Sequence, residues 1–447
     1  MTTSRRVLVV GSGGREHALA WKLSLDGADV LVAPGNAGTA QVAENIAIQP
    51  TDTESLLKIA KEREVDLTIV GPEAPLVAGI VDAFKKEGQR IFGPTAQAAQ
   101  LEGSKVFCKQ ILHRGDVPTA MYQAFDSPPD AIEFLNARED VPVVVKADGL
   151  AAGKGVFVCD SREEAITAIE TLKSDPQFKE ATSEILIEER LDGMEVSVMA
   201  ITDGRTIVTM PPLQDHKAAH DGDTGPNTGG MGAYCPTPFV NSELMQQIEE
   251  SILVPTIHSL RRSKVPFQGV LYAGLMLTNQ GPKVLEYNAR FGDPECQALM
   301  MRLESSILEL FDAAVDRQLE KVSTPIWRDD ASVTVVMASS GYPGKVEKGH
   351  LIHGLNEASS EDNVVVFHAA TRETPDGIVN DGGRVLSITG LGDTIAKAKL
   401  HAYSAVKKIR WQGAWCRKDI SDKAFSLPHG ELATRPASLR EHTEDHG

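Results

Sequence analysis

Residues 7–17 read Val-Leu-Val-Val-Gly-Ser-Gly-Gly-Arg-Glu-His, and this stretch sets the fold of the N-terminal part of the chain. A short apolar run rich in valine is typical of a buried strand, and the glycines that follow favour a tight turn. Beyond the turn, Ala18, Trp21 and Leu25 recur at helical spacing. The sequence therefore predicts a strand, a glycine-rich turn and a helix.

The same alternation continues to about residue 103. Three further apolar runs end at Pro-Gly or Gly-Pro and are expected strands, over residues 29–33, 65–70 and 90–92. Between them, helices are expected over residues 54–64 and 76–87. Short strands that alternate with helices favour a parallel sheet covered on both faces. We therefore predict a first α/β domain over residues 1–103.

The alternation of short strands and helices ends after Ser104. A helix over 105–114 is followed by strands over 143–147 and 155–159 with a glycine-rich loop between them, which predicts a hairpin-like lid. A helix over 162–173 and a strand over 185–188 come next. Further on, we predict a strand over 195–203, a long polar loop over 215–233, a helix over 242–262 and strands over 269–278 and 283–288.

The last part of the chain is β-rich. Strands are expected over 332–339, 364–368 and 384–389, with a closing helix over 394–409. The residues after Lys423 are polar and lack periodicity, which is typical of a disordered tail. The predicted domains are 1–103, 104–325 with a lid subdomain at about 122–187, 326–424, and a tail over 425–447.

Composition narrows the function classes. The chain has 447 residues, of which 42% are hydrophobic, so bulk disorder is excluded. Its formal net charge of −17 disfavours binding along nucleic acid. Five separated cysteines without a C-x-x-C pair fit a reducing compartment, and no run approaches the ~18 apolar residues of a membrane-spanning helix. We expect a cytoplasmic protein with no nucleic-acid or membrane partner.

The first glycine cluster suits one phosphate at a helix N-terminus, helped by Arg15. The dinucleotide pattern G-x-G-x-x-G is broken at Glu16, and the second strand runs into Pro34 instead of ending at an acidic residue. NAD binding is therefore disfavoured. A purely structural turn remains the alternative for this cluster.

The stretch from Lys146 to Gly155 resembles a phosphate-covering flap more than a Walker A loop. Only three residues separate Gly149 from Gly153, and Gly155 stands where a Mg²⁺-binding Ser or Thr would be needed. Lys146 ends a strand of valines, so it should be partly buried and need a partner. The alternative is a hairpin turn with solvated lysines.

The stretch from Lys283 to Glu295 is the most informative. Strand alternation places Glu286, Asn288 and, if the strand continues, Arg290 on one face. Carboxylate and carboxamide oxygens suit Mg²⁺, and an arginine beside them can grip an anion. A solvated strand face is the alternative. In the long polar loop, His216 and His220 lack a second ligand pair for zinc, so substrate binding is preferred there.

The order of these motifs closely resembles the phosphoribosylamine–glycine ligase family of ATP-grasp enzymes, from about Arg5 to Lys423. The motifs are GSGGREH (11–17), GPEAPLV (71–77), LEGSK (101–105), KADGLAAGKG (146–155), DGDTGPNTGGMG (221–232), EYNARFGDPE (286–295), GYPG (341–344) and GGRV (382–385). The resemblance implies an α/β and α+β multidomain fold. Its parts would be an N-terminal parallel pre-ATP-grasp domain, central ATP-grasp domains with a glycine-rich lid, and a small β-rich C-terminal domain.

The resemblance also implies the reaction. ATP, glycine and 5-phosphoribosylamine would give glycinamide ribonucleotide, ADP and phosphate through glycyl phosphate, in de novo purine biosynthesis. The family suggests a monomer that uses Mg²⁺ or Mn²⁺ with ATP as co-substrate and has small molecules as its partners.

Residue roles carry over motif by motif. The implied catalytic residues are Arg290, Asp293 and Lys146. The implied ATP contacts are Lys105, Lys146, Gly149, Gly153, Lys154, Gly155, Glu188, Glu189, Leu191 and Glu195. The implied substrate contacts are Gly13, Gly14, Arg15, Asp215, His216, Lys217, Asp221 and Arg290, and the metal ligands are Glu286 and Asn288.

Two positions depart from the family pattern. The neutral residues 275–277 stand where many ATP-grasp enzymes carry a further acidic metal ligand, and Ala218 stands where a basic residue often follows Asp-His-Lys. Three alternatives stay open: another ATP-grasp carboxylate ligase, an ATP-binding regulator without turnover, and an NAD-dependent oxidoreductase. The complete set Lys146, Glu286, Asn288 and Arg290 argues against the second, and the broken fingerprint against the third.

Overall fold

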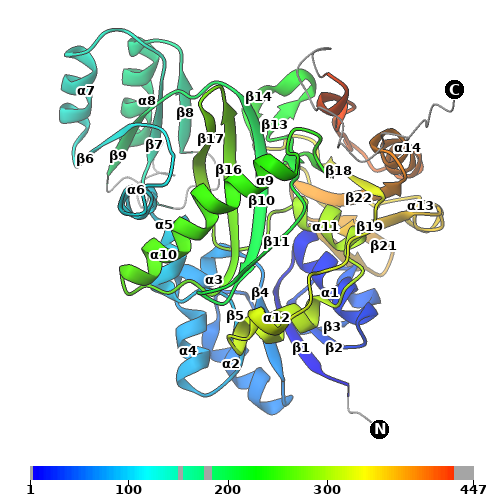
Figure 1. Cartoon of the computed structure of the whole chain (residues 1–447). Coiled ribbons are helices and arrows are strands. Elements are labelled where there is room, and N and C mark those ends of the chain that lie inside the picture. The colour runs from blue at the N-terminus through cyan, green and yellow to red at the C-terminus, as the bar shows by residue number, and fades with distance from the viewer. Residues whose placement is uncertain (1–3, 150–154, 176–183, 427–447) are drawn as a thin grey trace, which may run out of the picture.

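Figure 1 shows the computed structural model, which describes residues 4–149, 155–175 and 184–426. Most of the predicted tail, and Gly153 and Lys154 of the predicted lid loop, lie outside these residues. Over the described ranges, no helix combines the length and the apolar character that crossing a membrane requires.

The N-terminal part is a parallel sheet, as predicted. Its strand order is β3-β2-β1-β4-β5, with β1 (Arg6–Gly11), β2 (Asp29–Pro34), β3 (Glu44–Asn45), β4 (Leu67–Val70) and β5 (Ile91–Phe92). Its helices are α1 (Gly14–Leu25), α2 (Thr53–Glu62), α3 (Glu73–Val77), α4 (Ile80–Lys86) and α5 (Ala96–Gly103). The single helix predicted over 76–87 is wrong, because Gly79 has a φ of +91° and separates α3 from α4.

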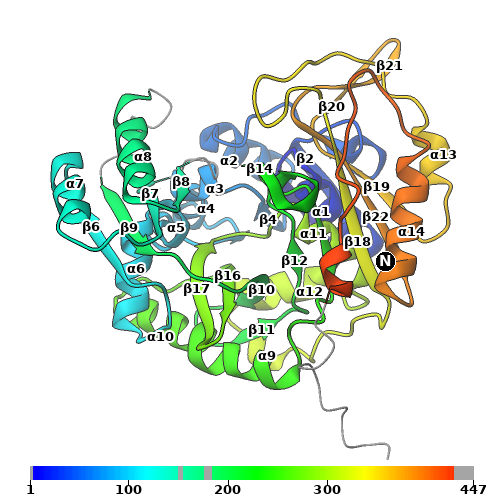
Figure 2. The same ribbon diagram turned by 90° about the horizontal axis from the view of Figure 1, so that it is seen from above.

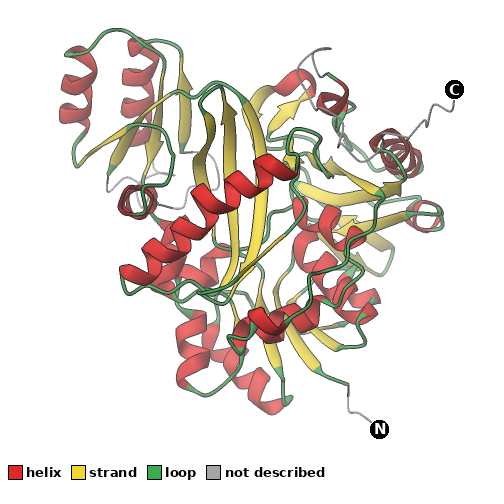
Figure 3. Ribbon diagram, in the orientation of Figure 1, coloured by secondary structure: helices red, strands yellow, loops and turns green. Residues whose placement is uncertain are grey.

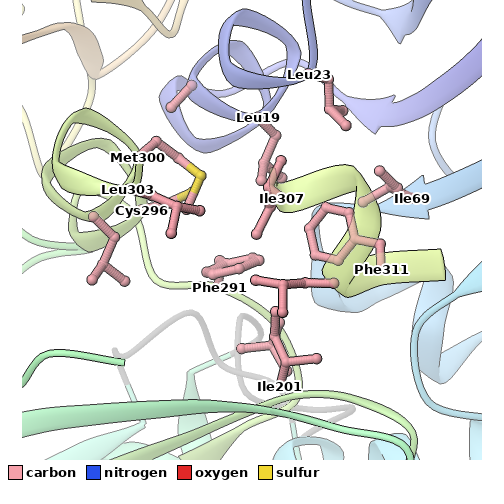
Figure 4. Close-up of a cluster of buried hydrophobic side chains, with 14 of the residues drawn as sticks. Leu19, Leu23, Ile69, Ile201, Phe291, Cys296, Met300, Leu303, Ile307 and Phe311 are labelled. Atoms are coloured by element: carbon pink, nitrogen blue, oxygen red, sulfur yellow. The ribbon is translucent and has the colours of Figure 1, made fainter. Parts of the chain in front are cut away.

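Alternate residues of β1 enter two different cores. Val7 and Val9 belong to one cluster, whereas Leu8 and Val10 belong to another that contains residues of α2 and α4. The first cluster includes residues from α11 (Glu295–Arg302) and α12 (Ile307–Val315), more than 280 positions further along the chain. Figure 4 shows Phe291, Ile307 and Phe311 packed beside Leu19 of α1. Both faces of the sheet are therefore covered, and one covering layer comes from the central part of the chain.

The lid is a four-stranded sheet of order β6-β9-β7-β8. The strands are β6 (Tyr122–Phe125), β7 (Val143–Ala147), β8 (Val156–Cys159) and β9 (Ile185–Glu189), and α6 (Lys105–Arg114) precedes them. Helices α7 (Pro128–Asn136) and α8 (Arg162–Ser174) pack on one face of it. Strands β7 and β8 are antiparallel neighbours, so the predicted hairpin is confirmed. The lid stands apart from the N-terminal sheet in Figure 1.

The central sheet has the order β11-β10-β16-β17. It contains β10 (Met194–Thr202), β11 (Ile207–Thr209), β16 (Gly269–Thr278) and β17 (Gly281–Asn288). The helix predicted over 242–262 is a continuous helical run made of α9 (Ser242–Ile248), a π-helical turn (Glu249–Leu253) and α10 (Val254–Arg262). Figure 3 shows this run lying across the strands of the sheet. It covers one face and leaves the other face toward the rest of the molecule.

The C-terminal sheet draws strands from two distant segments. Its order is β12-β15-β18-β22-β19, where β18 (Ala331–Ala338), β19 (Val364–His368) and β22 (Arg384–Gly392) are joined by β12 (Gln214–Asp215) and β15 (Gly232–Cys235). The prediction of one long loop over 215–233 is therefore wrong. Beyond β12, strands β13 (Ala218–His220) and β14 (Thr224–Asn227) form a hairpin. Helices α13 (Leu355–Ser359) and α14 (Ile395–Val406) and the hairpin of β20 (Thr371–Thr374) and β21 (Gly377–Asn380) complete this part (Figure 2).

Two buried histidines join the N-terminal and C-terminal parts. The Nδ1 atom of His17 accepts a 2.8 Å hydrogen bond from the backbone N–H of His368, and the two rings lie 5.8 Å apart. Burial, with repulsion from His368, lowers the pKa of His17 to about 3. Burial also lowers the pKa of His368 to about 4. Both rings are therefore neutral in the folded protein at neutral pH.

This pair makes the folded state sensitive to acid. Because both pKa values lie below the ordinary value of about 6.5, the unfolded chain takes up protons first as the pH falls. We expect the free energy of unfolding to fall by about 2 kcal/mol for each of these histidines between pH 7.5 and pH 5. Urea unfolding at the two pH values measures this. His17→Gln should flatten the dependence, whereas His113→Gln, on the exposed side of α6, should not. An equal pH dependence in wild type and His17→Gln would contradict the assignment.

Candidate active site

The lid presents two charged side chains on the face opposite its helices. Val145 and Ile187 face α7 and α8 in the lid core, so the alternation of β7 and β9 turns Lys146 and Glu188 to the other face. The Nζ atom of Lys146 lies 3.0 Å from Glu188 Oε2 and 3.3 Å from the carbonyl oxygen of Leu285 on β17. The lysine therefore has the partner that its predicted burial required, and it connects the lid to the central sheet.

A second lysine shares the same carboxylate. The Nζ atom of Lys109, on α6, lies 3.1 Å from Glu188 Oε2, and both side chains are almost completely buried. The other oxygen, Glu188 Oε1, is buried and has no hydrogen-bond partner among the described residues. One oxygen thus holds two cations while the other remains able to accept a hydrogen bond. Sequence reasoning missed Lys109; its only signal was its place four residues after Lys105 on the same helix.

Lys105 lies at the base of the lid loop. Its Nζ atom donates a 3.0 Å hydrogen bond to the carbonyl of Gly149, which has a φ of +89°. Burial lowers the pKa of Lys105, and repulsion from Lys146 acts in the same direction. Asp148, which the sequence did not single out, accepts hydrogen bonds from Ser104 Oγ and from the backbone N–H of Val106. It fixes the end of β7 to the start of α6.

The face of the central sheet away from α9 and α10 carries a second charged group. Glu286 and Asn288 alternate with Tyr287, which lies in the core on the helix side, so both point to the opposite face. Lys217 Nζ lies 3.4 Å from Glu286 Oε1 and 3.2 Å from Glu195 Oε2. Lys217 holds the pKa of Glu286 below its usual range, with help from Lys146 and Lys105. Burial opposes the charge on Lys217, but Glu195 and Glu286 raise its pKa well above the usual value.

The donor set fits a hard divalent cation. Glu286 and Asn288 offer a carboxylate and a carboxamide oxygen on one face, beside a position where a lysine cation is already stabilised. In the part of the chain that the structure describes, no group of three or more His, Cys, Asp or Glu gathers as a metal cage. Two protein oxygens are what Mg²⁺ takes when it keeps water and shares phosphate oxygens.

Arg290 lies beyond the end of β17, which stops at Asn288, so the condition that the strand continues is not met. Its Nη2 atom lies 2.7 Å from Glu102 Oε1 and its Nε atom 3.3 Å from Glu73 Oε2. Burial opposes its charge, yet these carboxylates raise the pKa of Arg290. Arg290 thereby joins three of the sequence motifs. Glu73 and Glu102 belong to these motifs, but the sequence prediction assigns neither of them a function.

The start of α1 is occupied by carboxylates of the protein itself. Asp293 Oδ2 accepts a 3.1 Å hydrogen bond from the N–H of Arg15, and Glu16 Oε2 accepts one of 2.6 Å from the N–H of Gly13. The Arg15 side chain is buried and bonds Glu16 and the carbonyl of Phe291. At Gly14, a Cβ atom would lie only 2.4 Å from Gln297 Nε2. Phosphate binding by Gly13, Gly14 and Arg15 stays a prediction, and the N–H groups of Gly13 and Arg15 already have partners.

The Asp-His-Lys triplet is divided between two faces. Asp215 Oδ1 is buried without a hydrogen-bond partner in the described ranges, and burial together with Glu295 raises the pKa of Asp215 well above its usual value. Lys217 faces Glu195 and Glu286, whereas the ring of His216 is buried beside Tyr234 and accepts from the N–H of Ser421. Burial, then Arg417, lowers the pKa of His216 to about 3.

Three other residues predicted to contact ATP or substrate, Glu189, Leu191 and Asp221, lie at the edge of this group of charged side chains. Glu189 Oε1 lies 3.3 Å from Lys283 Nζ and accepts from the N–H of Met121, while Leu191 is half-buried in the turn after β9. Asp221 is exposed and accepts from the N–H of Lys418. The structure thus brings together Lys105, Lys146, Glu195, Lys217 and Glu286, and it places His216 and Asp221 against the C-terminal segment instead.

Comparison with known proteins gives a consistent result over most of the chain. Models of phosphoribosylglycinamide synthetase match residues 5–102 with the N domain, 103–296 with the ATP-grasp (A) domain and 332–423 with the C domain. The chain is 58% identical over 426 residues to the phosphoribosylamine–glycine ligase of Rhodopirellula baltica, covering 94% of this chain and 98% of the relative. The Escherichia coli O157:H7 enzyme of that name is 49% identical over 426 residues, covering 94% and 99%.

Similarity to solved structures agrees with these sequence matches. The crystal structure of phosphoribosylamine–glycine ligase from Thermotoga maritima is similar with a TM-score of 0.80 and 35% identity, over 93% of this chain and 100% of that one. N5-carboxyaminoimidazole ribonucleotide synthetase from the same organism has a TM-score of 0.62 at 19% identity, over 91% and 99%, and it shares the fold.

Proposed function

Since the chain belongs to the phosphoribosylglycinamide synthetase family and ligates glycine to phosphoribosylamine with ATP in purine biosynthesis, we propose that this reaction passes through glycyl phosphate. A glycine carboxylate oxygen attacks the γ-phosphorus of ATP, and the bond to ADP breaks. The ribosylamine nitrogen then attacks the glycyl carbonyl carbon, loses a proton, and displaces phosphate. The two steps need charge neutralisation, alignment and exclusion of water.

The single observation that carries this proposal is the convergence of charge at Glu286. Lys217, Lys146 and Lys105 all lower the pKa of this carboxyl, although they come from the C-terminal sheet region, the lid and α6. A triphosphate over the central sheet would meet Lys105 and Lys146 from the lid side. Lys217 and Arg290 then neutralise the carboxylates Glu195, Glu286 and Glu102, at the end of the site where glycine and the ribosylamine would bind.

We assign the nucleotide end to the lid. Glu188 Oε1, which is buried and has no partner among the residues that the structure describes, supports a hydrogen bond from the exocyclic amino group of adenine, with Glu189 and Leu191 beside it and Glu195 toward the ribose. Glu286 and Asn288 would hold Mg²⁺ or Mn²⁺, which neutralises phosphate oxygens when bound. Asp215 and Lys217 would face glycine and the ribosylamine. The choice of metal, the monomeric state and the cytoplasmic location remain predictions from the sequence.

The direct test is ADP release by the purified protein with Mg-ATP, glycine and freshly generated phosphoribosylamine, with each component omitted in turn. We expect turnover only with all three, and little turnover when alanine replaces glycine. The proposal is wrong if ADP forms at the full rate without the ribosylamine or if alanine supports the same rate as glycine. Either result would leave ATP-grasp chemistry with a different acceptor or acid.

A further inference from the structure

Two motifs of the C-terminal part have no role in the scheme above, and both reach the glycine-rich loop before β15. Arg384, the first residue of β22, directs its Nη1 atom at the carbonyl oxygens of Gly229, Gly230 and Asp293. The hydroxyl of Tyr342 accepts a 3.2 Å hydrogen bond from the N–H of Gly229. The two side chains therefore hold both polar sides of one loop residue.

Two glycines lie in close contact with these side chains. A Cβ atom at Gly229 would lie 3.0 Å from the Cζ atom of Arg384, so the guanidinium rests on that residue. A Cβ atom at Gly383 would lie 2.3 Å from Cδ2 of Tyr342, so the tyrosine ring needs a glycine there. The Gly-Tyr-Pro-Gly and Gly-Gly-Arg-Val motifs therefore pack against each other and against the loop. We call Gly229, Tyr342, Gly383 and Arg384 the contact unit.

The contact unit is linked to the charged residues of the site by hydrogen bonds. The N–H and Oγ1 of Thr228, next to Gly229, both donate to the carbonyl of Lys217 at 2.8 Å. Lys217 in turn lies between Glu195 and Glu286. On the other side, Asp293 accepts from the N–H of Arg15 and from Gln297 Nε2. A shift of Arg384 would therefore displace Lys217 and Asp293.

We propose that Arg384, assisted by Tyr342, is a positioning residue of the ligase reaction, which holds residues 228–230 and Asp293 in place around the acceptor substrates. The inference rests on the proposed function. A planar guanidinium can donate to carbonyls while it stacks on a glycine, and the single ammonium of a lysine cannot reproduce both contacts. The C-terminal sheet is then part of the site, although Arg384 transfers no proton or phosphoryl group.

The test is steady-state kinetics of Arg384→Met, Arg384→Lys and Tyr342→Phe, with ADP release as the signal. We expect Arg384→Met to lower kcat roughly 10- to 100-fold, because small displacements of positioned groups have effects of this size. The KM for ATP should stay within about twofold of wild type, since Lys105 on α6 and Lys146 in the lid keep their partners. Arg384→Lys should recover part of kcat, and Tyr342→Phe should lose less than Arg384→Met. Because both residues act on Gly229, the double variant should lose less than the product of the single losses.

Arg372→Met is the matched control, an exposed arginine of β20 whose ion pair with Asp381 is 3.8 Å long. It should keep wild-type kinetics. The inference is overturned if folded Arg384→Met keeps kcat within about threefold of wild type, or if kcat and the KM for ATP deteriorate together in Arg384→Lys and Tyr342→Phe. Failure of the wild type to require phosphoribosylamine would refute the proposed function instead, so the two failures are distinguishable.

Discussion

Glu286→Ala is expected to lower kcat for ADP release by at least about 100-fold, because it removes the carboxylate of the proposed metal pair. The same change removes one of the two carboxylates that form ion pairs with Lys217 within the described residues and leaves Glu195. The side chain of Glu286 is 44% exposed, so the loss of stability should be small, on the order of 1 kcal/mol or less. Steady-state kinetics at several Mg²⁺ and Mn²⁺ concentrations, with a thermal unfolding curve, measure both effects.

The control is Glu309→Ala, which removes an exposed glutamate from α12 and should change neither quantity. Raised metal concentration should recover part of the rate in Glu286→Asp, which keeps a shorter carboxylate, but not in Glu286→Ala. A Glu286→Ala protein with nearly wild-type kcat at ordinary metal concentration would show that this carboxylate holds no metal essential to the reaction.

Glu188→Ala should destabilise the protein by about 3–5 kcal/mol, since it removes the carboxylate that contacts both buried lysines, Lys109 and Lys146. Both lysines lie 3.0–3.1 Å from the same oxygen, and the side chains of Lys109 and Glu188 are 3% and 2% exposed. Lys146 and Lys109 should then be repelled from each other, and nucleotide binding should weaken together with stability. Urea unfolding and binding of a fluorescent ATP analogue measure the two losses.

The neighbouring glutamate provides a matched control. Glu189 also faces a lysine, Lys283 at 3.3 Å, but the two side chains are 31% and 19% exposed. Because partly solvated pairs contribute little, Glu189→Ala should destabilise by no more than about 1 kcal/mol. If the two variants lose the same stability, the buried triad is not the source of the difference.

Much of the fold follows from local patterns. The valine-rich runs and helical spacings before residue 103 predict the parallel sheet, and the run of valines before Lys146 predicts that this lysine is partly buried. Prediction from the sequence fails where a segment takes its structure from a partner that is distant along the chain. Strands β12 and β15 are only two and four residues long, and they are strands because β12 pairs with β15, which pairs in turn with the distant β18. Gly79, likewise, interrupts a helix whose apolar spacing alone predicts continuity.

In the candidate site, too, residues placed by local rules could be predicted and residues placed by distant contacts could not. Strand alternation was enough to place Glu286 and Asn288 together, because that rule needs only neighbouring residues. It was not enough for Arg290, whose position depends on where β17 ends and on Glu73 and Glu102 of the N-terminal part. Lys109 was missed because a lysine on an amphipathic helix is ordinarily solvated, and only the approach of β9 makes it a buried partner.

The sharing of one sheet between distant segments also constrains how the chain acquires its structure during synthesis. Strand β15 ends at Cys235 and its partner β18 begins at Ala331, so the intervening sheet and helices leave the ribosome before the pair can form. Until then the edge of β15 opposite β12 is open, and an open strand edge is prone to non-native association. A truncation before residue 331 would make that exposure permanent. The part of the chain proposed to hold the acceptor substrates is therefore among the last to mature, and a nascent chain with a complete lid is not yet a ligase.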